Sequence, residues 1–166
     1  MQPTSAPFVT AADALHQISS RSQGERRRHA SAGALVLGVV EQALSNNGDL
    51  HSFSLARADR EVEALAPSAD RSILRRMLLA VTGDPVSLPQ LAAELLRYAS
   101  KLESTQRIAE ADAALALARA VVPRDSAAAL HAGRVARKLG ERARALELYR
   151  AARTLDGEDG GIARFA

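Results

Sequence analysis

The sequence predicts an all-α protein made of stacked helical hairpins, an α-solenoid, preceded by an N-terminal helical segment. The first reason is composition, because hydrophobic residues make up 47% of the 166 residues but aromatic residues only 3%. A core of alanine, leucine and valine favours closely packed helices over strands, which prefer β-branched and aromatic side chains. The second reason is that apolar residues recur at helical spacing, and the third is a 34-residue repeat in the last half of the chain.

The first half of the chain is predicted to contain about four helices within residues 10–86, after a flexible tail at residues 1–9. Thr10 with Asp13 resembles a capping box, in which the side chain of the first residue accepts a backbone N–H at the start of a helix. Clusters of Asn, Gly, Asp and Pro mark the helix ends, and the cluster at residues 46–49 is expected to stop the second helix. The helices are expected at about residues 10–20, 32–45, 55–66 and 70–82.

Three consecutive arginines, Arg26 to Arg28, precede the second of these helices. Cations at the start of a helix oppose its dipole. We therefore expect the helix to begin later, near Ser31, unless the arginines have another use. One such use is a basic arm that contacts nucleic acid or an acidic surface, and a solvated linker is the simpler interpretation.

The region at residues 87–159 contains two similar units, at residues 92–125 and 126–159. At an offset of 34 residues the matching pairs are Ala111 with Ala145, Leu115 with Tyr149, and Ala118 with Ala152. In each unit, these positions lie on the buried face of the second helix, where alanine lets two helix backbones approach and a larger side chain fills the adjoining groove.

Caps and stops divide each unit into two helices. Ser87 and Ser126 are expected to cap the first helix of each pair. Gly140 is expected to end the first helix of the second unit. Pro123 and Gly157 align at the same offset, and both are expected to end a second helix.

This pattern resembles the tetratricopeptide repeat, whose 34-residue unit forms a helix–turn–helix. The resemblance covers two units of 34 residues, or 68 of the 166 residues, and it is closer in the second unit. Ala99 and Gln106 stand where the family favours glycine, and Leu95 and Ala129 stand where it favours a large aromatic residue. The positions that carry the resemblance are Ala111, Leu115, Ala118, Pro123, Gly133, Gly140, Ala145, Tyr149 and Ala152, with Leu155 and Asp156 at the usual end.

Residues 160–166 are predicted to be either a tail or the start of a truncated capping helix. Repeat arrays normally close with a helix whose outer face is polar. An open end would be covered by a partner or by a second copy of the chain. A homo-oligomer formed through exposed repeat ends is therefore one prediction about partners.

The sequence carries no recognised catalytic pattern, so we predict that the protein is not an enzyme and uses no cofactor. It has no Gly-x-Ser-x-Gly motif, phosphate-binding loop or dinucleotide fingerprint. Cysteine is absent, and the four histidines are too far apart in sequence to suggest a metal site. The longest near-apolar run, residues 30–40, is about half of the ~20 residues that a membrane span needs. We therefore predict a cytoplasmic protein without a membrane span.

The distribution of charge predicts a binding surface. The formal net charge is only +3, but Ser126 to Arg153 contain seven Lys or Arg residues against two acids. In the family that the chain resembles, side chains of the first helices line a concave groove that takes extended peptides or helices of partner proteins. The resemblance implies a basic groove lined by Leu96, Arg97, Ser100, Leu130, His131, Arg134, Arg137 and Lys138.

We predict a protein–protein interaction module, acting as an adaptor, scaffold or assembly factor, whose groove binds an acidic peptide or helix of a partner. The alternative is a basic helical regulator that contacts nucleic acid. A solvated helix face without a partner is the simpler interpretation of the same charges.

Overall fold

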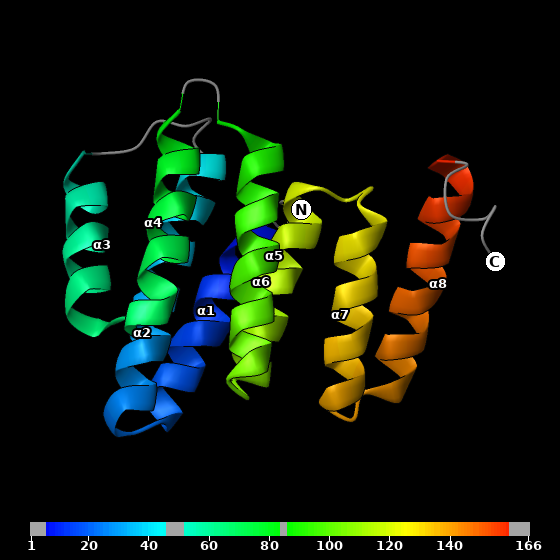
Figure 1. The fold of residues 1–166 in the computed structure, drawn as a ribbon, viewed down its shortest axis with the longest axis horizontal. Helices are drawn as coiled ribbons and strands as arrows, with labels where there is room; N and C mark the ends of the chain where they lie inside the picture. Colours follow the sequence, from blue (N-terminus) through cyan, green and yellow to red (C-terminus); the bar gives the residue numbers. More distant parts are fainter. Residues whose placement is uncertain (1–5, 46–51, 84–85, 160–166) are drawn as a thin grey trace, which may run out of the picture.

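The computed structural model describes residues 6–45, 52–83 and 86–159, and within these ranges the chain is all-α, with eight helices and no strand (Figure 1). Every helix among the described residues is too short or too polar to span a bilayer. The helices are α1 (Ala6–Arg21), α2 (Gly24–Ser45), α3 (Ser52–Leu65), α4 (Ser68–Thr82), α5 (Leu88–Ser104), α6 (Ile108–Val121), α7 (Ser126–Lys138) and α8 (Arg142–Asp159).

The first two helices begin earlier than predicted. Helix α1 starts at Ala6, so Thr10 lies inside the helix and does not cap it. Pro7 occupies the first turn, where its missing N–H would have no helical partner in any case. Helix α2 starts at Gly24, whose φ of +61° is in the left-handed region that glycine tolerates. The expectation of a start near Ser31 is therefore wrong.

Other predicted boundaries agree with α3 and α4 to within a few residues. The predicted stop at residues 46–49, most of the predicted tail at residues 1–9, and residues 160–166 lie outside the described residues.

Five helices form a closed ring around the centre of the molecule. Helix α1 packs on α2 and α6, α2 packs on α4, α4 on α5, and α5 on α6. The contact of α1 with α6 closes this ring between helices far apart in the sequence. In a regular solenoid each repeat contacts only its neighbours, so the first predicted hairpin, α5–α6, shares its core with the N-terminal helices.

The remaining helices flank the ring on opposite sides. Helix α3 packs on α2 and α4 at one edge of the molecule, and α7 packs on α6 at the other edge, with α8 outside it (Figure 1). The second predicted hairpin, α7–α8, is thus added to the side of the ring through α6.

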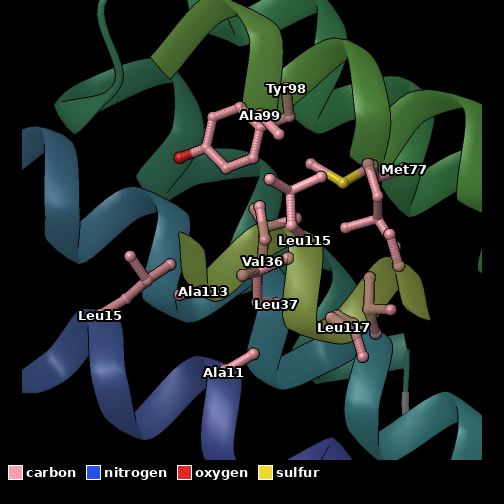
Figure 2. Packing of buried hydrophobic residues seen from close by; sticks show 14 of the residues in the cluster. Ala11, Leu15, Val36, Leu37, Met77, Tyr98, Ala99, Ala113, Leu115 and Leu117 are labelled. Carbon is pink, nitrogen blue, oxygen red and sulfur yellow. The ribbon is translucent and has the colours of Figure 1, made fainter. Parts of the chain in front are cut away.

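The core is built of small and branched side chains, as the composition predicts. Figure 2 shows buried residues of all five ring helices in one cluster. Tyr98 of α5 is the largest fully buried side chain. The labelled residues are Ala11 and Leu15 of α1, Val36 and Leu37 of α2, Met77 of α4, Tyr98 and Ala99 of α5, and Ala113, Leu115 and Leu117 of α6.

The two predicted hairpins have the same turn geometry at the 34-residue offset. Gly140 has a φ of +82°, and Gln106, at the equivalent position, has a φ of +61°. The first turn therefore keeps the left-handed conformation although it lacks the glycine that this conformation favours. The equivalent bonds are Gln106 N–H to Glu103 O (3.1 Å) and Arg107 N–H to Leu102 O (2.8 Å), and Gly140 N–H to Arg137 O (3.0 Å) and Glu141 N–H to Ala136 O (3.0 Å).

Three predicted helix boundaries in this region need correction. Ser87 occupies the N-cap position of α5, but its side chain accepts no capping hydrogen bond. Asp125, and not Ser126, caps α7, because its carboxylate accepts the N–H groups of Ala127 and Ala128 at 2.9 and 3.4 Å. Gly157 lies inside α8, because a glycine weakens a helix by only about 1 kcal/mol and does not remove a backbone donor.

The repeat positions on the second helices are buried, as their spacing predicts. Ala111, Ala118, Ala145 and Ala152 are all less than 5% exposed. Leu115 is fully buried, Tyr149 is partly buried against the core, and Pro123 is exposed.

Gly133 is matched to the tyrosine that faces it. A Cβ atom at Gly133 would lie 2.7 Å from Cε1 of Tyr149, so only glycine lets the ring rest on α7 without a shift. The equivalent pair in the first hairpin is Ala99 with Leu115, in which both residues are fully buried. The two hairpins therefore place a larger side chain opposite glycine and a smaller one opposite alanine.

A buried carboxyl joins α1 to α2. Oε1 of Glu41 accepts the backbone N–H of Ala12 at 2.9 Å, and the Glu41 side chain is otherwise enclosed by the helix interface. Burial raises the pKa of Glu41 from 4.5 to about 7; the Ala12 N–H opposes this shift, and the nearby charge of Asp13 adds to it.

Because the folded pKa of Glu41 lies above the unfolded one, its protonated form stabilises the fold fully below about pH 4.5, and this stabilisation is lost as the pH rises through about 7. Between pH 5 and pH 8, we expect the free energy of unfolding to change by about 2 kcal/mol less in Glu41→Gln than in the wild type. Urea unfolding followed by circular dichroism measures the difference. An unchanged pH dependence in the variant would contradict this assignment.

Candidate functional site

Four of the predicted groove residues lie around one hollow between α5 and α7. Its volume is about 300 Å³. Residues that the sequence did not single out complete its wall, and every residue around the hollow carries a polar or charged group. The predicted residues that line it are Ser100, His131, Arg134 and Lys138, and the added ones are Glu103, Ser104 and Gln106.

Glu103 is the most important residue that the sequence analysis missed. Its Oε1 accepts a hydrogen bond from Nζ of Lys138 at 2.7 Å, and its Oε2 lies 2.9 Å from Nε2 of His131. Burial alone would raise the pKa of Glu103, but the bonds to Lys138 and His131 outweigh it and hold the pKa below its ordinary value. Glu103 therefore bridges α5 to α7 and neutralises part of the positive charge expected there.

The 34-residue offset contains a signal for this contact. It aligns Glu103 with Arg137, the residue next to Lys138. Stacked hairpins bring equivalent positions to the same level. Opposite charges one position apart in the two units are therefore candidates for a bridge.

Arg97 belongs to a second hollow, of about 530 Å³, beside the first. Its Nη1 donates to Oε1 of Glu94, which is buried and also accepts Nε of Arg76 at 3.1 Å. The charge of Arg97 is therefore shared with an acid that the groove prediction did not include. Ile73, Leu96 and Lys101 line the same hollow.

The predicted cations that keep an uncompensated charge are Arg134 and Arg137. Both are exposed, and neither forms an ion pair with another described residue. Arg134 lines the hollow between α5 and α7, whereas Arg137 and the exposed Leu130 line none of the three hollows along α5. Arg134 is thus the predicted residue best placed to attract an anionic group.

A third hollow, of about 580 Å³, is mainly apolar and lies at the start of α5. It shares Leu96 with the second hollow, and the second shares Ser100 and Ser104 with the first. We call the three together the α5 trough, because they follow α5 along its length. The third hollow is lined by Pro89, Ala92, Ala93, Leu96, Val121, Val122, Pro123, Arg124 and Asp125.

The remaining candidates do not form a site with the α5 trough. Arg26, Arg27 and Arg28 are exposed on the first turn of α2, where their charge opposes the helix dipole. Among the described residues, no group of three histidine or acidic side chains is placed to hold a metal ion. His16 and Arg57 border a separate hollow of about 180 Å³ between α1, α2 and α3, and the rest of its wall comes from α2.

The most deeply buried charges join α4 to the turn between α5 and α6. Arg107 donates through Nη1 to Oδ2 of Asp70 at 2.7 Å and through Nε to Oε2 of Glu110. Each carboxylate also lies in the first turn of its helix, where the dipole favours negative charge. Burial raises the pKa of Glu110, and the Arg107 guanidinium opposes that shift. These groups line none of the hollows, so their role is to hold the ring together.

No protein-family model, curated protein or solved structure matches the chain significantly. The resemblance to the tetratricopeptide repeat therefore depends on the residues of the two hairpins and on the turn geometry that they share.

Proposed function

We propose that this protein is an interaction module in which α5–α6 and α7–α8 act as two tetratricopeptide-like hairpins and bind an acidic segment of a partner protein. The repeated turn hydrogen bonds and the buried alanines at the 34-residue offset support the likeness of the two hairpins.

The observation that carries the proposal is the position of Arg134. Its exposed guanidinium borders a polar hollow together with two serine hydroxyls and the Gln106 amide, all of which can donate hydrogen bonds. Guanidinium groups bind carboxylates through paired, charge-assisted hydrogen bonds. Lys138 can add to this by exchanging its bond to Glu103 for one to a bound carboxylate.

The direct test is the binding of fluorescently labelled acidic peptides, measured by fluorescence anisotropy. We expect Arg134→Glu to weaken binding by at least about ten-fold. Arg153→Glu on α8 is the matched control, because it makes the same change in net charge at another exposed position. Equal affinities of the two variants would contradict a site at Arg134.

The same variants identify the partner class in cell extract. A protein that is captured by the wild type and by Arg153→Glu, but not by the double variant Arg134→Glu with Lys138→Glu, supports the adaptor role. Nucleic acid that co-purifies and is lost when Arg26, Arg27 and Arg28 are changed to Gln would favour the regulator of nucleic acid instead, and its binding would fall steeply with salt.

A further inference from the structure

The α5 trough changes in character from one end to the other. At the start of α5 its wall is made of proline, alanine, valine and leucine side chains, and Leu88 beside it is 40% exposed. At the end of α5 its wall is made of hydroxyl, amide and charged groups. A volume of about 580 Å³ at the apolar end far exceeds the ~30 Å³ share of a single water molecule. It is large enough for a whole apolar side chain.

The two ends are joined along α5 by a row of uncharged side chains, with Arg97 and Lys101 beside it. Leu96, Ser100 and Ser104 follow each other at four-residue intervals and are shared between neighbouring hollows. From Ala92, in the wall of the apolar hollow, to Ser100, which the 34-residue offset places at the level of Arg134, there are eight residues of helix, which correspond to about 12 Å along the axis. A segment that lies on this path therefore meets apolar surface first and Arg134 about 12 Å later.

Free charge along the trough has one sign. The acids on its walls are already engaged, because Asp125 caps α7 and Glu103 binds Lys138 and His131. Arg134 and Lys101 form no ion pair with any residue that the structure describes. Charge complementarity therefore favours an occupant with a carboxylate at the polar end.

We infer that the α5 trough recognises an extended segment of a partner protein by two points, a large apolar side chain and a carboxylate about four residues apart. The spacing follows from the ~12 Å between the two ends and a rise of about 3.3 Å per residue in an extended chain. This inference depends on the proposed function, and it adds a motif to it. The apolar side chain enters the hollow beside Ala92 and Val122, and the carboxylate meets Arg134.

The probe is a set of labelled synthetic peptides with one Leu and one Asp in a Gly-Ser background, separated by one to eight positions. We expect the highest affinity when Asp follows or precedes Leu by four positions, and a loss of about ten-fold or more when Leu is replaced by Ser. Replacing Asp by Lys in the best peptide should abolish binding. Affinity that is independent of spacing, or of Leu, would overturn the two-point inference while leaving acidic binding intact.

Protein variants separate this inference from the proposed function. Ala93→Glu places a charge in the apolar hollow, and we expect it to remove the contribution of Leu but not that of Asp. Ala116→Glu, at an exposed alanine of α6, is the matched control. Leu96→Ser provides the same test should Ala93→Glu fail to fold by circular dichroism.

Three other outcomes are decisive. Failure of every peptide to bind the wild type would overturn both the inference and the proposed function. Loss of Leu-dependent affinity in Ala116→Glu as large as in Ala93→Glu would overturn the inference alone. Self-association detected by sedimentation, with peptide binding lost as the protein concentration rises, would assign the trough to a second copy of the chain and also overturn it.

Discussion

Replacing Arg107 with methionine is expected to lower the free energy of unfolding by about 3–5 kcal/mol. The side chain of Arg107 is only 10% exposed, and its removal would leave Asp70 and Glu110 buried without a compensating charge. Urea unfolding followed by circular dichroism measures this loss. Because the group joins α4 to the α5–α6 turn, the variant should also unfold less cooperatively.

Two controls separate buried charge from the loss of a large side chain. Arg75→Met removes a cation that pairs with Asp59 and Glu63 on the surface, and such pairs contribute about 0–1 kcal/mol. Adding Asp70→Asn and Glu110→Gln to Arg107→Met removes the uncompensated charges, and we expect this triple variant to regain most of the lost stability. Equal losses in Arg107→Met and Arg75→Met would show that burial of this cluster contributes little.

Replacing Gly33 with alanine is expected to lower the free energy of unfolding by about 3 kcal/mol. A Cβ atom at this position would lie 2.5 Å from the Tyr98 hydroxyl oxygen and 3.3 Å from Cδ1 of Leu15. Tyr98 is completely buried, so its ring has no free space into which to move. Thermal unfolding followed by circular dichroism detects the change.

The Tyr98 hydroxyl provides the control for this prediction. Arg107 lies near it, but the hydroxyl forms no hydrogen bond of good geometry within the described residues. A buried hydroxyl without a partner is destabilising by about 1–3 kcal/mol. We therefore expect Tyr98→Phe to be neutral or stabilising, and Gly33→Ala to be much less harmful in the Tyr98→Phe background. Additive effects of the two changes would contradict the close contact of Gly33 with the Tyr98 side chain.

The positions of most helices could be predicted because their signals are local. Buried faces repeat every three or four residues, and Pro or Gly marks the turns, so α3, α4, α5 and α7 begin within about three residues of the expected positions. The errors have local causes as well. Asp125 competes with Ser126 for the cap of α7, and the missing N–H of Pro7 lets α1 start before Thr10.

The candidate site could be predicted only in part. The resemblance to the tetratricopeptide repeat placed Ser100, His131 and Arg134 in one groove, and the structure brings them to one hollow. It did not show that Glu103 neutralises Lys138, nor that the apolar hollow continues the groove toward the start of α5. Both features depend on which side chains fill the space between helices.

The sequence by itself determined that this chain is helical, where its hairpins turn, and which face of each helix is buried, because those properties follow from backbone propensity and from spacing along a single helix. The tertiary structure alone decided that α1 packs on α6 and that Arg107 meets Asp70, 37 residues away. Periodicity shows that a face will be buried but not what will cover it, and alanine-rich faces fit many neighbours. The choice among those neighbours is made by contacts between residues distant in sequence. The five helices close into a ring only if the buried charges and Tyr98 find matching space.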